Sequence, residues 1–270
     1  MGGFGPPSED LMSKICLIDG DTVAYRCAAS VEPTKTREAE PDDLAILRAD
    51  ELMYRILNET QAAEYQVFLS GGEQFRKILY PEYKANRKQP PPRMLGACQE
   101  FLVNEWNAKV VHGYEADDAI GMAHDPEKTI VAANDKDFRQ LPGEHYNFVK
   151  LEWEIIDELT AEFNFWCQML IGDSSDNVKG VDRIGKAKAP RILTGMSVEQ
   201  MYETVKELYG DEERFLNSFR MLRILRSPVE FENIMKEIEN KNSLGQSEGE
   251  EFTENGGAED FGDVSEAHSQ

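Results

Sequence analysis

The sequence has few cysteines, no long apolar run and a shortage of positive charge. None of its four Cys forms a C-x-x-C pair, so neither a thiolate zinc site nor a disulfide framework is expected, and the thiols are predicted to stay reduced. The apolar runs are far shorter than a membrane span, and the first residues lack the charged and apolar regions of a signal peptide. We therefore expect a cytoplasmic protein that makes no membrane contact.

Negative charge dominates what is present. With 29 basic and 51 acidic residues the formal net charge is −22, which argues against a passive, non-specific binder of nucleic acid. Part of this charge lies in residues 241–270, which are rich in Glu, Asp, Gly and Ser and are predicted to be a disordered acidic tail. Such a tail aids solubility, or docks on a basic surface such as that of a replication protein. Residues 1–13 are predicted to be a flexible N-terminus.

Alternating apolar patterns predict an α/β fold. Short apolar runs predict strands at residues 14–20, 64–70, 108–113, 128–135 and 144–151. Helical spacing predicts helices at residues 41–60, at 94–106 and from 115 onward. This order indicates a mostly parallel central sheet flanked by helices within residues 14–156, followed by a helical portion at residues 157–240.

Acidic residues follow the predicted strands at the points where the strands end. The carboxyl ends of parallel strands share one edge of a sheet, and such folds place their sites there, so these acids are expected to lie close together. They are Asp19 and Asp21, then Glu115, Asp117 and Asp118, then Asp135 and Asp137, and, after the next helix, Asp173 and Asp176.

Each acidic motif alone has an ordinary explanation, as a helix N-terminus, an N-cap or a turn. Together they are harder to explain, because like charges about 4 Å apart repel by roughly 4 kcal/mol per pair at an effective dielectric near 20. Such a cluster needs divalent cations or shifted pKa values. Oxygen ligands without His or Cys favour Mg²⁺ or Mn²⁺, and two such ions are the usual apparatus of phosphodiester hydrolysis. His112 and His124 are predicted to be structural.

A basic segment stands out in this acidic chain. Residues 75–93 combine cations with aromatic rings, which suits phosphate contact and base stacking, although a solvated helix with a Pro-rich loop has the same composition. The cations are Arg76, Lys77, Lys84, Arg87, Lys88 and Arg93, and the rings are Phe75, Tyr80 and Tyr83. Farther along, Gly180 and Gly185 flank a turn before Lys186 and Lys188, a pattern that presents backbone N–H groups to a phosphate.

The motifs together resemble one family. The stretches "LIDGD", "YPEYKANR", "EADDAIG", "NDKDFRQL" and "LIGDSSDNVKGVDRIGKAKA" occur in the order typical of the flap endonuclease/5′→3′ exonuclease family. The resemblance covers roughly residues 14–195 and is greatest to phage-encoded 5′→3′ exonucleases and to the 5′-nuclease domain of bacterial DNA polymerase I. It implies a PIN-like nuclease core and, if the chain is phage-encoded, a location in the host cytoplasm.

The resemblance also implies a role for each motif. The first metal ion would be held by Asp19, Glu115, Asp117 and Asp118, and the second by Asp135, Asp137, Asp173 and Asp176. Lys84 and Arg87, at the base of a basic arch, would grip the scissile phosphate, and Tyr83 would stack on the terminal base. Further DNA contacts would come from Arg76 and Lys88. Residues 176–195 would form a helix-hairpin motif that holds the duplex through Gly180, Gly185, Lys186 and Lys188, with K⁺ bound by its carbonyls.

One departure from the family pattern lies after the second strand, where the family usually has an Asp. Ser70, Gly71 and Gly72 occupy that place here. We therefore expect the first ion to be held more weakly, with a raised Mg²⁺ requirement, unless Asp21 compensates. A Gly71→Asp variant would lower that requirement.

These observations predict a Mg²⁺- or Mn²⁺-dependent 5′→3′ exonuclease that acts in replication. Its substrates would be double-stranded DNA with 5′ ends, nicks or flaps and RNA primers in RNA–DNA hybrids, and its products would carry a 5′ phosphate. Lys84, Arg87, Asp117 and Asp137 are the expected catalytic residues. The short arch favours exonuclease over 5′-flap endonuclease, which is the main alternative. A catalytically impaired DNA-binding relative ranks lower, as does a toxin-like RNase, because such RNase domains are shorter and lack "YKANR".

Overall fold

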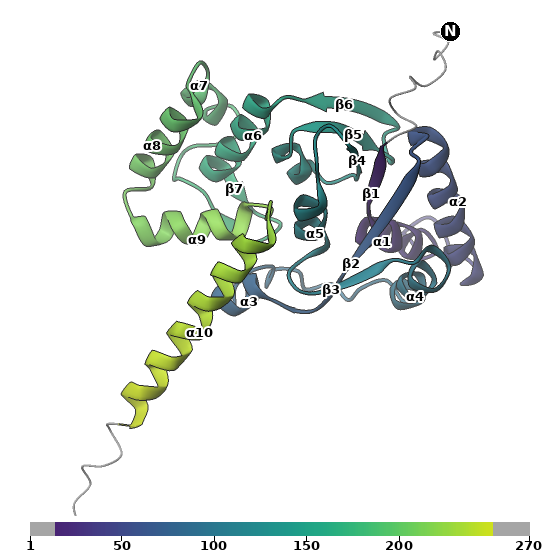
Figure 1. The fold of residues 1–270 in the computed structure, drawn as a ribbon. Coiled ribbons are helices and arrows are strands. Elements are labelled where there is room, and N and C mark those ends of the chain that lie inside the picture. Colours follow the sequence, from purple (N-terminus) through teal and green to yellow (C-terminus); the bar gives the residue numbers. More distant parts are fainter. Residues whose placement is uncertain (1–13, 251–270) are drawn as a thin grey trace, which may run out of the picture. The chain divides into compact units, whose positions relative to one another are not determined.

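The fold is built on one central sheet, in a computed structural model that describes residues 14–250 and the side chains of residues 14–240. Six strands lie in the order β3-β2-β1-β4-β5-β6, and all neighbours are parallel except β5 and β6 (Figure 1). The strands are β1 (Ile15–Asp19), β2 (Glu64–Gln74), β3 (Lys109–Gly113), β4 (Thr129–Ala132), β5 (Gly143–Asn147) and β6 (Glu152–Ile156). The predicted α/β class with a mostly parallel sheet is confirmed.

The central strands form where the apolar runs predict them. In β1, Cys16, Leu17 and Ile18 are buried, because β1 lies between β2 and β4 and both of its faces are covered. Strand β6 is not predicted by the sequence, since it is an edge strand whose residues 152–155 are exposed and therefore carry no buried-strand pattern. The parallel register brings the carboxyl ends of β1, β2 and β4 to the same edge.

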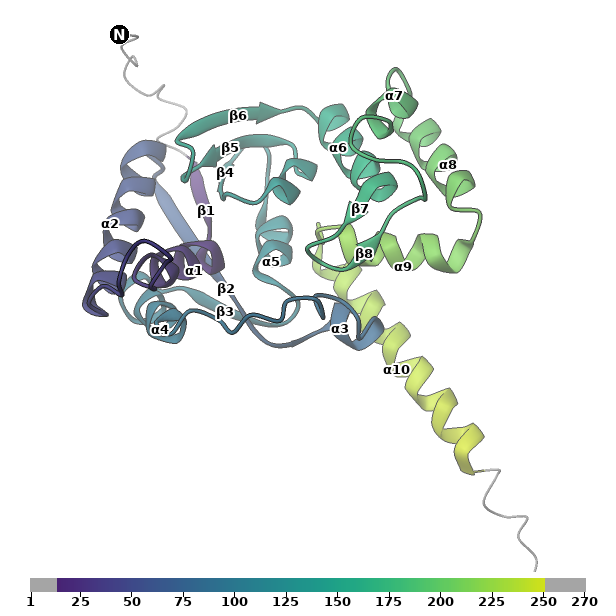
Figure 2. The same cartoon turned by 180° about the vertical axis from the view of Figure 1, so that it is seen from behind.

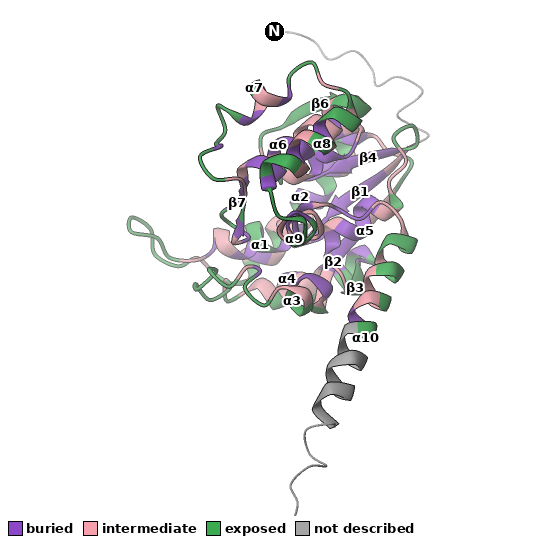
Figure 3. Ribbon diagram, turned by 90° about the vertical axis from the view of Figure 1, so that its left-hand side faces the viewer, coloured by how far each residue is buried: buried purple, intermediate pink, exposed green. Residues whose placement is uncertain are grey.

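Helices cover both faces of the sheet (Figures 1 and 2). One face packs against α1 (Gly20–Ser30), α2 (Asp43–Thr60) and α4 (Leu95–Trp106), and the other packs against α5 (Ala116–Ala123) and the chain at Ile224. Figure 3 shows the buried strands enclosed between exposed helix faces. Helix α1, which the sequence does not predict, begins directly after β1. Gly20 permits this turn, because a Cβ at that position would lie 2.6 Å from the carbonyl oxygen of Phe68.

The helical portion forms a second apolar core. It is enclosed mainly by α6 (Glu158–Ile171), α8 (Val198–Tyr209) and α9 (Glu212–Leu222). Between α6 and α8 lie the hairpin strands β7 (Gly172–Asp173) and β8 (Val178–Lys179) and the short helix α7 (Ala189–Leu193). Residues 176–195 form a β-hairpin strand, turns and one short helix. The helix-hairpin motif predicted there stays a prediction.

The last helix, α10 (Pro228–Glu250), begins at the end of the first compact unit, which runs to Phe231, and continues into a second unit. Its backbone is helical through residue 250, whereas the sequence predicts disorder from residue 241. Residues 241–250 contain two Gly and two Ser, so local propensity does not account for the helix there, which continues one already formed at residues 228–240. The rest of the predicted tail, 251–270, and the predicted flexible N-terminus, 1–13, lie outside the described residues. None of the helices in residues 14–250 is long and apolar enough to cross a membrane.

Gly121 marks a close approach between α5 and the chain after α9. A Cβ there would lie 2.3 Å from the carbonyl oxygen of Leu225 and 2.4 Å from Cγ2 of Ile224. We expect Gly121→Ala to lower the free energy of unfolding by about 1–3 kcal/mol, measured by urea denaturation, because α5 must move away from this backbone. The matched control is Gly96→Ala in α4, where a Cβ meets nothing within 4 Å. That change is expected to stabilise the protein by up to about 1 kcal/mol, and equal effects at the two sites would contradict the close approach.

Candidate active site

Carboxylates from three separate segments line one cavity at the carboxyl edge of the sheet. The cavity has a volume of about 1180 Å³. Its acids lie after β1, at the start of α5 and after β4, and Lys84 and Arg87 also form part of its wall. These acids are Asp19, Asp21, Glu115, Asp117, Asp135 and Asp137. Asp118, Asp173 and Asp176 do not line it, so the predicted edge is assembled only in part as expected.

Asp19 ends β1 and caps α1. Its Oδ1 accepts a hydrogen bond from the Thr22 backbone N–H at 3.0 Å, and Oδ2 accepts one from the Thr22 hydroxyl. Burial raises the pKa of Asp19 to about 6, and the charges of Asp21 and Asp135 add to the rise. The carboxylate is therefore held in place by its cap although its negative charge is unfavourable there.

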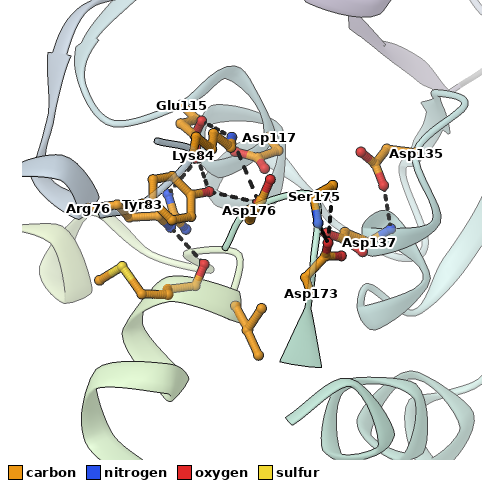
Figure 4. Close-up of polar contacts among 12 residues, drawn as sticks. Arg76, Tyr83, Lys84, Glu115, Asp117, Asp135, Asp137, Asp173, Ser175 and Asp176 are labelled. Atoms are coloured by element: carbon orange, nitrogen blue, oxygen red, sulfur yellow. Dashed lines mark hydrogen bonds and ion pairs between the residues drawn. The ribbon is translucent and has the colours of Figure 1, made fainter. Parts of the chain in front are cut away.

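Glu115 lies just before α5 and is surrounded by positive charge. Lys84 Nζ donates to its Oε1, and Arg76 Nη1 lies 3.4 Å from its Oε2. Burial alone would raise the pKa of Glu115, but the charges of Arg76 and Lys84 outweigh burial and lower it. Glu115 thus stays ionised inside the protein. Figure 4 shows Lys84 beside it.

Arg76 and Asp118 form a buried ion pair, which overturns one prediction. Arg76 is 2% exposed and Asp118 is fully buried, and Nη2 of Arg76 donates to Oδ1 of Asp118 at 2.7 Å. Arg76, in α3 (Phe75–Leu79), also donates to the carbonyl oxygens of Met221 and Arg223. The prediction that Arg76 contacts DNA is wrong, because its guanidinium is enclosed. Asp118 faces Arg76 and does not line the cavity, and its role as a ligand of the first metal ion stays a prediction.

Tyr83 is a second basic-segment residue whose predicted role the structure contradicts. It is 3% exposed, and its hydroxyl lies 2.8 Å from Oε2 of Glu115 and 3.0 Å from Oδ2 of Asp176. Neither face of the ring is free to stack on a base. Tyr83 instead positions the two carboxylates, which belong to segments far apart in the sequence.

Lys84 and Arg87 form ion pairs with acids of the site, and their predicted grip on the scissile phosphate stays a prediction. Lys84 adopts a left-handed backbone conformation, with φ of 57°, and its backbone N–H donates to the carbonyl oxygen of Asp176 at 3.0 Å. Its Nζ lies 3.9 Å from Oδ2 of Asp176, while Nη2 of Arg87 lies 2.7 Å from Oδ1. The base of the predicted arch is therefore docked on the β7–β8 hairpin, and the Arg87 guanidinium stays more than half exposed.

Asp135, Asp137 and Asp173 form a second acidic group (Figure 4). It surrounds a lysine that the sequence pattern did not mark as a site residue. Lys136, between Asp135 and Asp137 in "NDKDF", has Nζ 2.5 Å from Oδ2 of Asp173 and 3.3 Å from Oδ1 of Asp137. Burial raises the pKa of Asp137 to about 6, with a further rise from Asp135. For Asp173 burial acts in the same direction, but hydrogen bonds from Lys136 and Ser175 outweigh it and lower the pKa. The signal for Lys136 in the sequence is its position between two acids in "NDKDF".

The chemistry of these donors fits a hard divalent cation. All are carboxylate oxygens, and those with raised pKa values would be stabilised by added positive charge; they are Asp19, Asp21, Asp117 and Asp137. Among the described residues, no three acidic, His or Cys side chains already converge on a single point. The reason is visible in the ion pairs, since Lys84, Arg87 and Lys136 lie between the acids.

The end of β2 carries no carboxylate at the position where the sequence analysis noted its absence. A Cβ on Gly71 would lie 2.5 Å from Cγ1 of Val110 and 3.0 Å from Cε1 of His112, both on the neighbouring strand β3. An Asp at residue 71 would therefore clash with β3. We therefore expect Gly71→Asp neither to add a metal ligand nor to lower the Mg²⁺ requirement.

The remaining predicted residues are less directly placed. Lys88, Lys186 and Lys188 are exposed, and no Cβ clash constrains Gly185. Gly180 has a packing reason of its own, because a Cβ there would lie 2.4 Å from the backbone nitrogen of Gly172. Their DNA contacts stay predictions.

His124 is structural, as predicted. Its Nδ1 lies 2.7 Å from the Thr129 hydroxyl and its Nε2 lies 2.5 Å from the carbonyl oxygen of Pro142. Burial lowers its pKa.

Comparison with solved structures gives the class of fold. A zinc-bound structure of T5 5′-exonuclease matches with a TM-score of 0.60 and 16% identity, over 84% of this chain and 98% of that chain. Flap endonuclease-1 from Methanococcus jannaschii matches with a TM-score of 0.51 and 15% identity, over 81% of each chain. The six-stranded sheet and its flanking helices are thus a PIN-like nuclease fold.

Comparison of sequences gives the family. Residues 14–165 match the family described as 5′-3′ exonuclease, N-terminal resolvase-like domain. The 5′-3′ exonuclease of Buchnera aphidicola is 24% identical over 82% of this chain and 82% of its own length. DNA polymerase I of Bacillus subtilis is 28% identical over 73% of this chain, which spans only 25% of that polymerase. The chain belongs to the 5′-3′ exonuclease family.

The raised pKa of Asp19 predicts a pH-dependent stability effect in protein kept in EDTA. A carboxyl whose pKa is raised on folding stabilises the fold at low pH and loses that contribution as the pH rises through about 6. Asp19→Asn keeps the cap and removes the charge, so it should raise the free energy of unfolding at pH 8 by about 1–3 kcal/mol and leave it unchanged near pH 3.5.

Asp157 provides the matched control, because it caps α6 through Thr160 in the same way that Asp19 caps α1 through Thr22. Hydrogen bonds from Thr160 lower the pKa of Asp157. Asp157→Asn should therefore lower stability at pH 8. A gain at Asp19 that is the same at both pH values would contradict the assigned pKa.

The Arg76–Asp118 pair predicts strong coupling in a double-mutant cycle. Arg76→Met leaves the Asp118 carboxylate buried and unpaired, which should cost about 3–5 kcal/mol in urea denaturation. Adding Asp118→Leu should recover much of that loss, since the unpaired charge is then removed. As a control, Arg37→Met breaks the more exposed Arg37–Glu40 pair and should cost less than about 1 kcal/mol. Additive losses at Arg76 and Asp118 would contradict the pairing.

Proposed function

We propose that this chain is a 5′→3′ exonuclease that hydrolyses double-stranded DNA with the help of two divalent cations, Mg²⁺ or Mn²⁺. The observation that carries the proposal is the single cavity on which three chain segments place carboxylates, with Lys84 and Arg87 on its wall. Membership of the 5′-3′ exonuclease family supports the reaction and its polarity.

The carboxylates divide into two groups. Asp19, Glu115 and Asp117 would hold the first ion, and Asp135, Asp137 and Asp173 would hold the second, with Asp176 between them. When bound, two such ions would supply a hydroxide nucleophile at neutral pH and would stabilise the charge on the leaving 3′ oxygen. Catalysis by a His or Ser nucleophile is not required.

The cations of the site have a second task. Lys84, Arg87 and Lys136 neutralise Glu115, Asp176 and Asp173, and Lys84 and Arg87 also line the acidic cavity. A DNA phosphate that replaces a carboxylate as the partner of Lys84 or Arg87 would be held beside the reacting centre. These side chains would thus bring the scissile phosphate to the ions.

The arch segment supports exonuclease over flap cleavage. Its base is docked, since the side chains of Asn86 and Arg87 donate to the carbonyl oxygens of Ser174 and Ser175. Its far end is also tied down, because Arg93 pairs with Asp42 and donates to Glu40. A segment fixed at both ends leaves little slack for threading a 5′ flap. Flap endonuclease activity is the alternative, and both T5 5′-exonuclease and flap endonuclease-1 share the fold.

The proposal includes further partners. Residues 176–195, with Lys186 and Lys188, would contact the duplex backbone and bind K⁺ through carbonyl oxygens. RNA primers paired to DNA would be substrates, and the acidic residues near the C-terminus would contact a replication protein.

The test uses 5′-end-labelled nicked duplex, 5′-flap duplex and an RNA–DNA hybrid, each with Mg²⁺ or with EDTA. Release of labelled mononucleotide from the nicked duplex is expected with Mg²⁺ and not with EDTA. Asp137→Asn should reduce its release by at least about 100-fold, because the second ion loses a ligand. Glu127→Gln, which removes an exposed acid that precedes β4 and lies away from the cavity, is the control and should leave the rate unchanged.

The other outcomes are equally informative. Flap-length oligonucleotides as the main product would replace the proposal with a structure-specific endonuclease. Binding of the nicked duplex without cleavage would make the chain a DNA-binding relative of the nucleases. Cleavage that persists in EDTA would refute the role of divalent cations.

A further inference from the structure

Asp21 is an acid of the cavity to which the family resemblance assigns no role. It lies in the first turn of α1, and its Oδ1 and Oδ2 accept the Ser70 backbone N–H at 3.2 and 3.1 Å. It lines the same cavity as Asp19, Glu115 and Asp117. Burial raises its pKa, with a further rise from the charge of Glu115. Its side chain lines the cavity and is held in place there by the Ser70 backbone N–H.

Neither Gly71 nor Gly72 of β2 is suited to carry a carboxylate. Gly71 is closed off by Val110 and His112, as described above, and Gly72 has a φ of +69°, which disfavours an L side chain. Ser70 is the last of these residues to line the cavity. Its hydroxyl oxygen accepts the Ala116 backbone N–H at 2.8 Å, so Ser70 joins α1 to the start of α5, next to Glu115 and Asp117.

No basic side chain among the described residues forms an ion pair with Asp21. Among the described residues, Glu115 is paired with Lys84, whereas Asp19, Asp21 and Asp117 take part in no ion pair. All three line one cavity, in which like charges repel one another. A divalent cation between them would remove that repulsion, and Asp21 is the one whose orientation β2 itself fixes.

We propose that Asp21 is a ligand of the first divalent cation in this chain, in the place of the carboxylate that β2 lacks, and that the Ser70 N–H holds it in position. The inference rests on the proposed two-cation function. It assigns to α1 two ligands, Asp19 before the helix and Asp21 within its first turn.

The test is Mn²⁺ binding to the full chain, followed by electron paramagnetic resonance and by calorimetry without DNA. Asp21→Asn keeps an oxygen acceptor for Ser70 and removes the charge, so it should weaken binding at one of the two sites by about 10- to 100-fold. The concentration of Mg²⁺ that gives half-maximal cleavage should rise in parallel. Glu127→Gln is the control, because Glu127 is an exposed acid that precedes β4, at the opposite edge of the sheet from the cavity, and should leave binding within about twofold of wild type.

A second variant tests the position rather than the charge alone. Asp21→Asn/Ser70→Asp moves the carboxylate to the end of β2, where it still accepts the Ala116 N–H. We expect this variant to recover part of the lost Mn²⁺ affinity. Thermal unfolding in EDTA checks that each variant is folded, and Asp21→Ser replaces Asp21→Asn if the latter is not.

The failure of this inference is distinguishable from failure of the proposed function. If Asp21→Asn binds Mn²⁺ as wild type while Asp137→Asn loses one ion and cleavage, Asp21 is not a ligand and the nuclease assignment stands. If Asp137→Asn also binds Mn²⁺ and cleaves as wild type, the two-cation function is overturned and the role of Asp21 falls with it.

Discussion

The structure depends on how negative charge is accommodated at one edge of the sheet. Carboxylates that end β1 and β4 and precede α5 are brought together because parallel strands finish at the same edge. Lysines and arginines placed between the acids offset part of their repulsion, and burial raises the pKa of Asp19, with a further rise from the charges of Asp21 and Asp135. Added positive charge would relieve this unfavourable arrangement, which is the physical basis of the proposed divalent-cation site.

The buried network around Arg76 gives this edge its rigidity. Its guanidinium joins Asp118 in α5 to the backbone of Met221 and Arg223, so the helix that carries Glu115 and Asp117 is fixed to the C-terminal helices. Gly121 allows the same helix to approach the carbonyl oxygen of Leu225. Residues that look like substrate contacts in the sequence thus serve to hold the carboxylates of the site in position. Among the described residues of the basic segment, Lys84 and Arg87 both contact these acids and line the cavity.

The α1 helix, which the sequence does not predict, contributes directly to the site. It starts immediately at the end of β1, is capped by Asp19 and presents Asp21 to Ser70. The missing carboxylate after β2 and the presence of Asp21 are therefore related through one hydrogen bond. A change of ligand from a strand end to a helix turn keeps the donor chemistry while the backbone of β2 packs closely against β3 at Gly71.

The sequence by itself determined the α/β class, the main strands and the family, because periodic apolar runs and local motifs such as "YKANR" are contiguous in the chain. It also identified the acids of the cavity, since each follows a strand end that the same patterns predict. Only the tertiary structure decided which charges reach the cavity and which are buried in ion pairs. Arg76 and Asp118, or Tyr83 and Asp176, are far apart in sequence, and whether such groups face solvent or one another depends on packing that no local pattern encodes.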